Sequence, residues 1–243
     1  MSELRIENMT KKYPSGVVAL EKINMMVRPG ESVAVFGLER SGKSTLLRIL
    51  AGLEPVTLGH IFLDAKDITE TPAKERGVAY VFQSSALDNK KNVYDNLAYG
   101  LTLRKVSPAV IDIKVKAVAE MLGLTDVLTR KPKTITTLQR RRVIMGRTIV
   151  RDPKVYLFDE PLAGLDEDLC EQTLQDLVTL QVRLKATFVY ATENIRDAAI
   201  VGSKIAILSE GKLLQFDTAE NLYAHPANSF VAEIMGSHRG FSK

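Results

Sequence analysis

The chain has 243 residues, of which 45% are hydrophobic and 26% are charged, with 15 glycines, 9 prolines and no tryptophan. This length is enough for one well-buried core and too little for two large domains of about 100 to 200 residues each. The apolar and charged fractions lie near the averages of globular proteins, which excludes a disordered, collagenous or coiled-coil chain.

The charge balance is mildly basic, with 33 basic and 29 acidic side chains and a net charge of +4. An excess of this size is typical of a solvated surface, so we expect no nucleic-acid partner. The single cysteine, Cys170, excludes an internal disulfide and fits a reducing compartment. No apolar run approaches the roughly 18 residues of a membrane span, and the first residues lack the pattern of a signal peptide. We therefore expect a partner to hold the protein wherever it works at a membrane.

The N-terminal part predicts strands and then a helix. Apolar residues over 4–9 are spaced as in a strand, and two further apolar stretches follow at 17–20 and 23–27. These segments predict an antiparallel layer. Residues 32–36 then predict a short buried strand that leads into a glycine-rich loop and a helical pattern at 46–50. Strand, loop and helix in this order begin an α/β unit.

The middle of the chain, residues 86–150, shows no strand pattern and predicts a helical insert. Alternation of strands and helices then returns and implies a mostly parallel sheet that is covered on both faces. The predicted elements are strands over 78–82, 155–158, 187–191 and 204–208, a helix over 166–185, and a hairpin strand over 212–216.

Residues 37–44 match the pattern G-x-x-x-x-G-K-[ST] between a strand and a helix. In such a loop, backbone N–H groups converge on phosphate oxygens, and the helix N-terminus adds positive potential. Lys43 is expected to reach the β- and γ-phosphates, and Ser44 to ligate Mg²⁺. The expected nucleotide-binding residues are Gly37, Leu38, Glu39, Arg40, Ser41, Gly42, Lys43, Ser44 and Thr45.

Two acidic residues at the end of a later strand fit the same site. Asp159 and Glu160 follow the apolar run 155–158. We expect Asp159 to hold the metal and Glu160 to polarise the attacking water. The predicted fold is therefore α/β, a P-loop nucleotide triphosphatase core with a mostly parallel sheet, an N-terminal antiparallel β layer and a helical subdomain insert.

The order of these motifs resembles the ATP-binding subunit of ABC transporters over nearly the whole chain. Three segments, VFQSSALDNKKNVYDNLAYGL, KPKTITTLQRRRVIMGRTIVRDPKVYLFDEPLAGLD and GKLLQFDTAENLYAHPANSFVAEIMG, are most similar to the maltose-type, sugar-importing branch. The resemblance implies that Tyr13 stacks on adenine and that Asp166 closes a dimer contact. It also implies that Gln83 senses the metal and the membrane partner.

The same resemblance implies a peripheral protein at the cytoplasmic face of the cell membrane that binds ATP and Mg²⁺. Its partners would be transmembrane permease subunits, a second ATP-binding subunit and, indirectly, a solute-binding protein. The single domain 1–243 would have two lobes, a core of 1–85 with 152–243 and a helical subdomain of 86–151. The extra small β domain of the sugar-importer relatives would be absent beyond Gly236.

Three features depart from the family pattern. Arg40 stands where the phosphate loop has a glycine, and a left-handed backbone there would cost about 1 to 3 kcal/mol. The L-S-G-G-Q signature loop is replaced by Ile135, Thr136, Thr137, Leu138 and Gln139. Thr136 keeps a hydroxyl for a phosphate, whereas Thr137 and Leu138 should hold the partner's nucleotide off.

The third departure is Glu193, which stands where the family has its switch histidine. An ionised carboxylate about 4 Å from a γ-phosphate oxygen is repelled by about 4 kcal/mol at an effective dielectric constant near 20. We therefore expect Glu193 to turn away or to be protonated. The altered signature and Glu193 together predict slow turnover. The alternatives are a fully active transport ATPase and a non-hydrolysing nucleotide-binding partner subunit. A DNA-maintenance or translation ATPase is disfavoured, because the chain has neither a coiled-coil insertion nor a second cassette.

Overall fold

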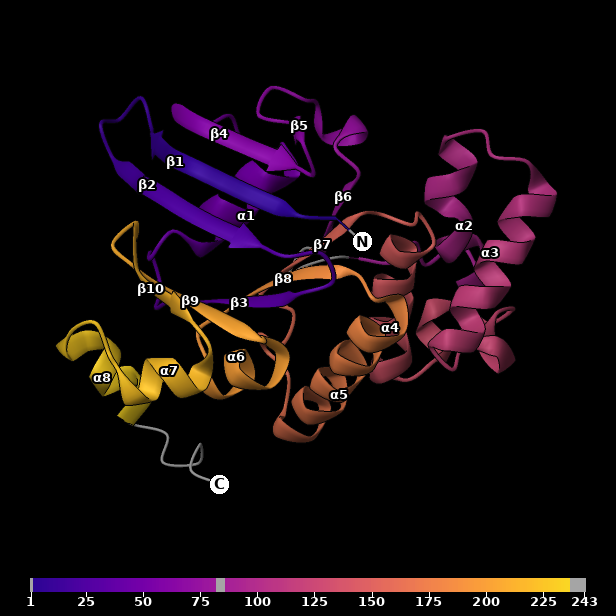
Figure 1. The fold of residues 1–243 in the computed structure, drawn as a ribbon. Coiled ribbons are helices and arrows are strands. Elements are labelled where there is room, and N and C mark those ends of the chain that lie inside the picture. Colours follow the sequence, from indigo (N-terminus) through magenta and orange to yellow (C-terminus); the bar gives the residue numbers. More distant parts are fainter. Residues whose placement is uncertain (1, 82–85, 237–243) are drawn as a thin grey trace. The chain divides into compact units, whose positions relative to one another are not determined.

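The computed structural model describes residues 2–81 and 86–236 (Figure 1). It divides the chain into two compact units. The first comprises Met1–Tyr80, Lys154–Pro161 and Leu177–Lys243, and the second comprises Val81–Pro153 and Leu162–Asp176. This division differs from the lobes expected from the sequence, because residues 162–176 group with the helical unit. The guanidinium of Arg142 in that unit binds the carboxylate of Asp176 through two hydrogen bonds of 2.7 and 2.9 Å.

The first unit contains a four-stranded antiparallel sheet in the order β2-β1-β4-β5. Its strands are β1 (Leu4–Lys12), β2 (Val18–Val27), β4 (Leu58–Leu63) and β5 (Lys66–Asp67). The predicted antiparallel layer is confirmed. The two apolar stretches after β1 form the single strand β2, whose pairing with β1 shifts register several times. Strand β4 was not predicted, since only Ile61 and Leu63 in it are buried and alternation is therefore weak.

The second sheet of this unit has six strands in the order β10-β9-β3-β8-β7-β6. Strands β3 (Ser32–Phe36), β7 (Val155–Asp159), β8 (Thr187–Thr192) and β9 (Lys204–Ser209) pair in parallel, and β10 (Lys212–Asp217) forms the predicted hairpin with β9. Strand β6 covers Val78–Val81. The predicted mostly parallel sheet is confirmed, and every residue of its inner strands β3, β7 and β8 is buried.

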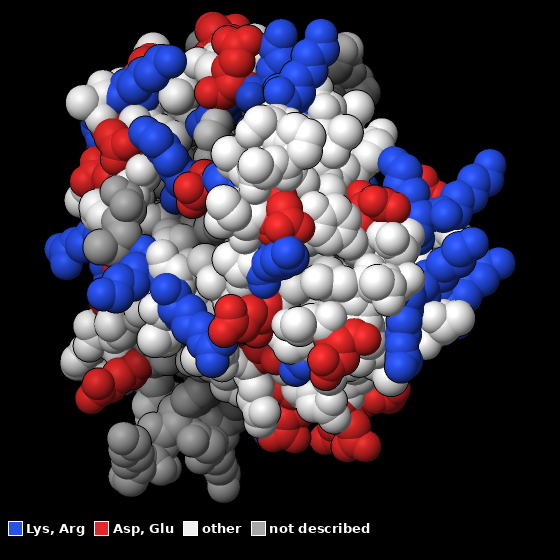
Figure 2. Space-filling view, turned by 90° about the vertical axis from the view of Figure 1, so that its right-hand side faces the viewer, with Lys and Arg blue, Asp and Glu red and all other residues white. Residues whose placement is uncertain are grey.

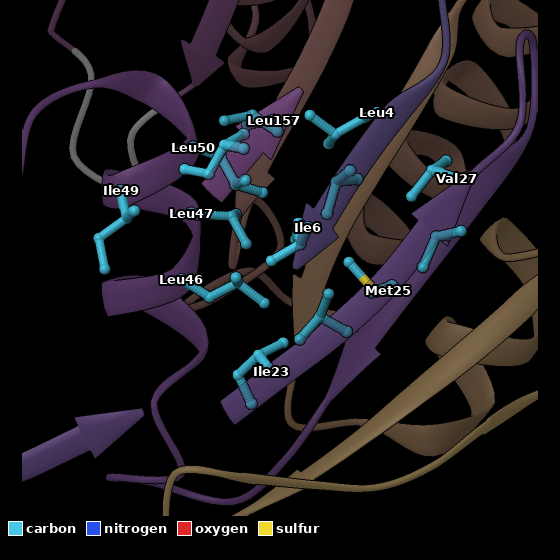
Figure 3. Packing of buried hydrophobic residues seen from close by; sticks show 14 of the residues in the cluster. Leu4, Ile6, Ile23, Met25, Val27, Leu46, Leu47, Ile49, Leu50 and Leu157 are labelled. Carbon is cyan, nitrogen blue, oxygen red and sulfur yellow. The ribbon is translucent and has the colours of Figure 1, made fainter. Parts of the chain in front are cut away.

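Helix α1 (Lys43–Ala51) packs its apolar face into the core of the first unit. Figure 3 shows Leu46, Leu47 and Leu50 of α1 facing Ile6 of β1 and Ile23 of β2. All five side chains are fully buried. Burying one such side chain contributes about 1.5 to 3 kcal/mol. The core therefore fixes the first turn of α1, and with it the phosphate loop, against the ends of the strands. The unit also contains α6 (Ile195–Val201), α7 (Ala219–Ala224), α8 (Ser229–Gly236) and the 3₁₀ turn Ala73–Glu75.

The second unit is helical, as the sequence predicted for 86–150. It contains α2 (Val93–Leu103), α3 (Pro108–Met121), α4 (Thr137–Ile149), the N-terminal part of α5 (Glu167–Leu184) and the 3₁₀ turns Thr125–Val127 and Pro132–Thr134. Gly146 lets α4 pack closely on its neighbours, since a Cβ there would lie 3.0 Å from Leu122 Cδ1. None of the helices within 2–81 and 86–236 is long and apolar enough to cross a bilayer.

Candidate nucleotide-binding site

Strand register in the six-stranded sheet brings the predicted site residues of the first unit together. Phe36, the last residue of β3, pairs with Thr192 of β8, and Asp159 of β7 pairs with Ala191. Parallel strands end at the same edge of a sheet, so the segments that follow these three strands meet there. Those segments hold the phosphate loop, Glu160 and Glu193.

Glycines shape the phosphate loop. A Cβ on Gly37 would lie 2.6 Å from the Leu208 carbonyl oxygen, and one on Gly42 would lie 2.7 Å from the Ala19 carbonyl oxygen. Gly42 also has a φ of 104°, which favours glycine. Arg40 adopts a φ of 63° with its side chain exposed, so the predicted left-handed backbone is present at this position.

Lys43 lies in the first turn of α1 with only 4% of its side chain exposed. Its ammonium donates to the carbonyl oxygens of Gly37 and Leu38 at 2.7 and 3.0 Å. It also contacts Oε1 of Glu193 at 3.1 Å and Oε1 of Glu160 at 3.4 Å. The Lys43 ammonium therefore attracts the Glu193 carboxylate. That Glu193 turns away from a bound γ-phosphate, or is protonated beside it, stays a prediction.

Asp159 is positioned as a metal ligand would be. Its Oδ1 accepts a hydrogen bond from Ser44 Oγ at 3.0 Å, and its Oδ2 accepts one from the Tyr80 hydroxyl at 2.5 Å. Burial, reinforced by the hydrogen bond to Asp159, raises the pKa of Tyr80 strongly, so this phenol stays a donor. Carboxylate and hydroxyl oxygens are hard donors that suit Mg²⁺ when phosphates and water complete the shell. Ser44 and Asp159 thus fit the ion, and the described residues contain no cluster of three His, Cys, Asp or Glu side chains that would hold a metal by itself.

The phosphate loop borders a cavity of about 500 Å³ in the first unit. Ser41 Oγ, in the wall of this cavity, is buried and has no hydrogen-bond partner among the residues that the structure describes. An added acceptor such as a phosphate oxygen would satisfy it. The cavity is lined by Val17, Val18, Ala19, Glu39, Arg40, Ser41, Gly42, Lys43, Ser44, Thr45, Glu160, Glu193, Glu210 and Gly211.

Four described residues that were predicted for this site do not line the cavity: Tyr13, Gly37, Leu38 and Asp159. Tyr13 is half-buried outside its lining, and its hydroxyl donates to Glu54 Oε2 at 2.7 Å. Its stacking on adenine remains a prediction. Gln83 lies outside the described residues. Sequence reasoning missed Tyr80 and the exposed Val17 and Val18, because an aromatic or apolar residue carries no motif of its own.

The remaining predicted residues lie in the second unit. Thr136 caps helix α4, since its Oγ1 accepts the Gln139 N–H at 3.1 Å and Gln139 Oε1 accepts the Thr136 N–H at 3.0 Å. This reciprocal capping box leaves the hydroxyl proton of Thr136 as its donor. Thr137 is exposed, whereas Ile135 is buried. Asp166 is exposed and accepts the Leu169 N–H at 2.9 Å at the start of α5.

Comparison with known proteins agrees with this arrangement. Residues 20–163 match the model of the family described as ABC transporter. The sn-glycerol-3-phosphate import ATP-binding protein of Psychromonas ingrahamii is 44% identical over 98% of this chain and 64% of its own length. The oligosaccharides import ATP-binding protein of Bacillus subtilis is 39% identical over 98% of this chain and 65% of its own length. The chain thus spans slightly under two thirds of these relatives.

Solved structures show the same fold. A nucleotide-free ATP-binding cassette from an ABC transporter superposes with a TM-score of 0.83 at 23% identity, over 96% of this chain and 98% of the other. A dimeric cassette in a post-hydrolysis state with ADP and phosphate bound gives a TM-score of 0.74 at 26% identity, over 88% and 98% of the two chains. By its matching family model, its phosphate loop and the acidic residues beside that loop, the chain belongs to the ABC transporter family.

Proposed function

We propose that this chain is the ATP-binding subunit of an ABC importer for a sugar or a related small solute. The observation that carries the proposal is the pair Lys43 and Ser44 in the wall of the cavity, with Asp159 hydrogen-bonded to Ser44. The two relatives, which are import ATP-binding proteins for sn-glycerol 3-phosphate and for oligosaccharides, support the importer class. Mg-ATP binding and hydrolysis would be coupled to transport.

Each residue of the group has a distinct task in this proposal. The backbone N–H groups of the loop and the Lys43 ammonium bind the phosphates, and Ser44 and Asp159 hold the metal. The metal neutralises charge on the phosphates when bound. Glu160 follows β7 with a φ of 46°, and its N–H donates to the Ala191 carbonyl oxygen at 3.1 Å. This fixed turn would let its carboxylate orient the attacking water and accept a proton.

A second ATP-binding subunit would complete the site. The resemblance to the family implies that residues 135–139 of one subunit would face the nucleotide of the other and that Asp166 would lie at the dimer contact. The dimeric relative with ADP and phosphate bound supports this assembly. The side chains of Thr137 and Leu138, which replace glycines, would keep the backbone away from the partner's γ-phosphate.

The second unit offers a surface for a membrane permease. A cavity of about 310 Å³ there is lined by Ala86, Leu87, Asp88, Lys91, Asn96, Tyr99 and Arg147. Lys91 Nζ lies 4.1 Å from the centre of the Tyr99 ring, which is 39% exposed. On the face shown in Figure 2, uncharged surface is interspersed with acidic and basic side chains. A cavity lined by an aromatic ring together with charged and polar side chains fits a short helix of a permease, and such docking would place the chain at the cytoplasmic face of the membrane.

A second candidate function is a nucleotide-binding partner subunit that does not hydrolyse ATP. The contact between Glu193 and Lys43 favours it, because the family's histidine is replaced by an acid that neutralises the phosphate-binding ammonium. Both candidates share nucleotide binding and differ in turnover, which we expect to be slow.

Titration of the purified protein with Mg-ATP tests the shared part. Lys43→Ala should abolish measurable binding, whereas Lys74→Ala, on a lysine side chain that is 80% exposed, should leave it unchanged. Equal binding by the wild type and Lys43→Ala would contradict both candidates.

The rate of phosphate release from ATP distinguishes the two candidates. A low rate that is abolished by Glu160→Gln supports the transport ATPase. No phosphate release supports the partner subunit that does not hydrolyse ATP. A rate typical of a working transporter would contradict slow turnover.

Copurification with permeases encoded beside the gene tests the docking surface. Tyr99→Asp should lower recovery of the permeases at least about tenfold, because it puts an acid into an aromatic contact. Ile113→Asp, at a side chain that is 69% exposed on α3, is the matched control in the same unit. Equal loss in both variants, or no loss in either, would contradict the assigned surface.

A further inference from the structure

We propose that Glu193 determines nucleotide specificity and makes this site favour a nucleoside diphosphate over a triphosphate. The inference rests on the proposed function, since it assumes that the phosphate loop binds a nucleotide. It concerns which nucleotide the free subunit retains, and it follows from the partners of Lys43.

The Lys43 ammonium has a complete set of partners without any phosphate. Two carbonyl oxygens of its own loop lie at 2.7 and 3.0 Å, and the carboxylates of Glu193 and Glu160 lie at 3.1 and 3.4 Å. Only 4% of the side chain is exposed, so water cannot replace these groups readily. A buried ammonium needs such compensation. Of the two acids, Glu193 makes the shorter contact with it.

The backbone sets the position of Glu193. The Asn194 N–H donates to Thr192 Oγ1 at 3.0 Å, which closes a tight turn directly after β8. Asn194 Oδ1 then accepts the Arg196 N–H at 2.9 Å and caps helix α6. Residues on both sides of Glu193 are therefore fixed, and its side chain is presented to the phosphate loop by the turn.

A triphosphate and a diphosphate affect the contact between Glu193 and Lys43 differently. The lysine of a phosphate loop reaches the β- and γ-phosphates, so a γ-phosphate must share or replace the Glu193 carboxylate at Lys43. Two anions at one ammonium repel each other. A diphosphate brings no γ-phosphate, so the contact between Glu193 and Lys43 can persist. Because 44% of the Glu193 side chain is exposed, the carboxylate can leave for solvent, and ATP binding is weakened rather than prevented.

Removal of the charge should not unfold the protein. In Glu193→Gln, the Lys43 ammonium keeps both loop carbonyl oxygens and the Glu160 carboxylate. Glu193→Asp keeps the negative charge but shortens the side chain by one methylene group. This variant therefore separates the effect of side-chain length from the effect of charge. Glu210→Gln is the matched control, because Glu210 lines the same cavity and has no hydrogen bond or ion pair with Lys43 among the described residues.

The experiment compares the dissociation constants of Mg-ADP and of the Mg-bound β,γ-imido analogue of ATP by calorimetry. We expect the wild type to bind ADP more tightly than the analogue. Glu193→Gln should raise affinity for the analogue at least about tenfold, which equals about 1.4 kcal/mol, and affinity for ADP by much less. Glu193→Asp should lie between, and Glu210→Gln should leave the ratio of the two constants unchanged.

An equal gain for both nucleotides in Glu193→Gln, or a wild type that prefers the analogue, would overturn the inference and leave the proposed function standing. No binding of either nucleotide by the wild type or by Glu193→Gln would instead overturn the proposed function. Melting temperatures of all variants should stay near that of the wild type, and a large drop in Glu193→Gln alone would assign Glu193 a structural role.

Discussion

Ser44 Oγ donates a hydrogen bond to Asp159 Oδ1 at 3.0 Å and so joins the first turn of α1 to the end of β7. The two residues are far apart in the sequence and come from different motifs. Asp159 is 8% exposed, and the Tyr80 hydroxyl holds its other oxygen. A metal placed between Ser44 and Asp159 would therefore meet two oxygens that are already oriented.

Asp159→Asn should reduce the gain in ATP affinity that Mg²⁺ provides by about tenfold or more, because a neutral amide replaces a charged ligand. Titration with ATP in the presence of Mg²⁺ and of EDTA measures this gain. Tyr80→Phe, which removes only the donor to Oδ2, should reduce it less. A full Mg²⁺ effect in Asp159→Asn would show that the metal is held elsewhere.

The capping box of α4 should couple Thr136 and Gln139 energetically. Each single change to alanine removes one of the two reciprocal hydrogen bonds and should lower the free energy of unfolding by about 1 kcal/mol. The double variant should lose less than the sum of the single losses, because either change disrupts the same box. Urea denaturation of the three variants gives the coupling, and additive losses would exclude a cooperative cap.

Arg40→Gly should stabilise the phosphate loop. Arg40 has a φ of 63°, and glycine removes the steric cost of this conformation. Part of the gain is lost to the greater freedom of glycine in the unfolded chain, so the net increase in the free energy of unfolding should be at most about 1 kcal/mol. Thermal denaturation measures it. A lower melting temperature would mean that the exposed arginine makes a favourable interaction in solution.

Asp67 should give the antiparallel sheet a pH-dependent contribution. The Thr69 side chain and N–H, together with His60, hold the pKa of Asp67 below its ordinary value of 3.8. The stabilisation is therefore present above pH 4 and is lost as pH falls through the folded-state pKa. Asp67→Asn should lower the free energy of unfolding at pH 7, and the difference from wild type should shrink at pH 3. A difference that stays constant with pH would contradict this assignment.

The sequence alone determined the elements that depend on local pattern. The phosphate loop, the acids at the end of β7 and the buried strand Ser32–Phe36 were predicted at their observed positions, because strict residue types and short apolar runs carry strong signals. The helical insert was recognisable for the same reason. Strand β4 was not recognisable, since glycine and histidine interrupt its alternation of apolar and polar residues. The sequence also did not show that the two apolar stretches of β2 form one strand.

Tertiary structure decided which side chains meet. The Thr136 hydroxyl, expected to serve a phosphate, caps its own helix, and the Tyr13 hydroxyl binds Glu54. The contact between Glu193 and Lys43 depends on parallel register, which brings the end of β8 beside the end of β3. Repulsion between Glu193 and a phosphate can be argued from the sequence. Attraction between Glu193 and the buried ammonium of Lys43 can be argued only when the positions of both side chains are known. The sequence therefore specified the chemistry of the site, and the fold decided which charges neutralise one another.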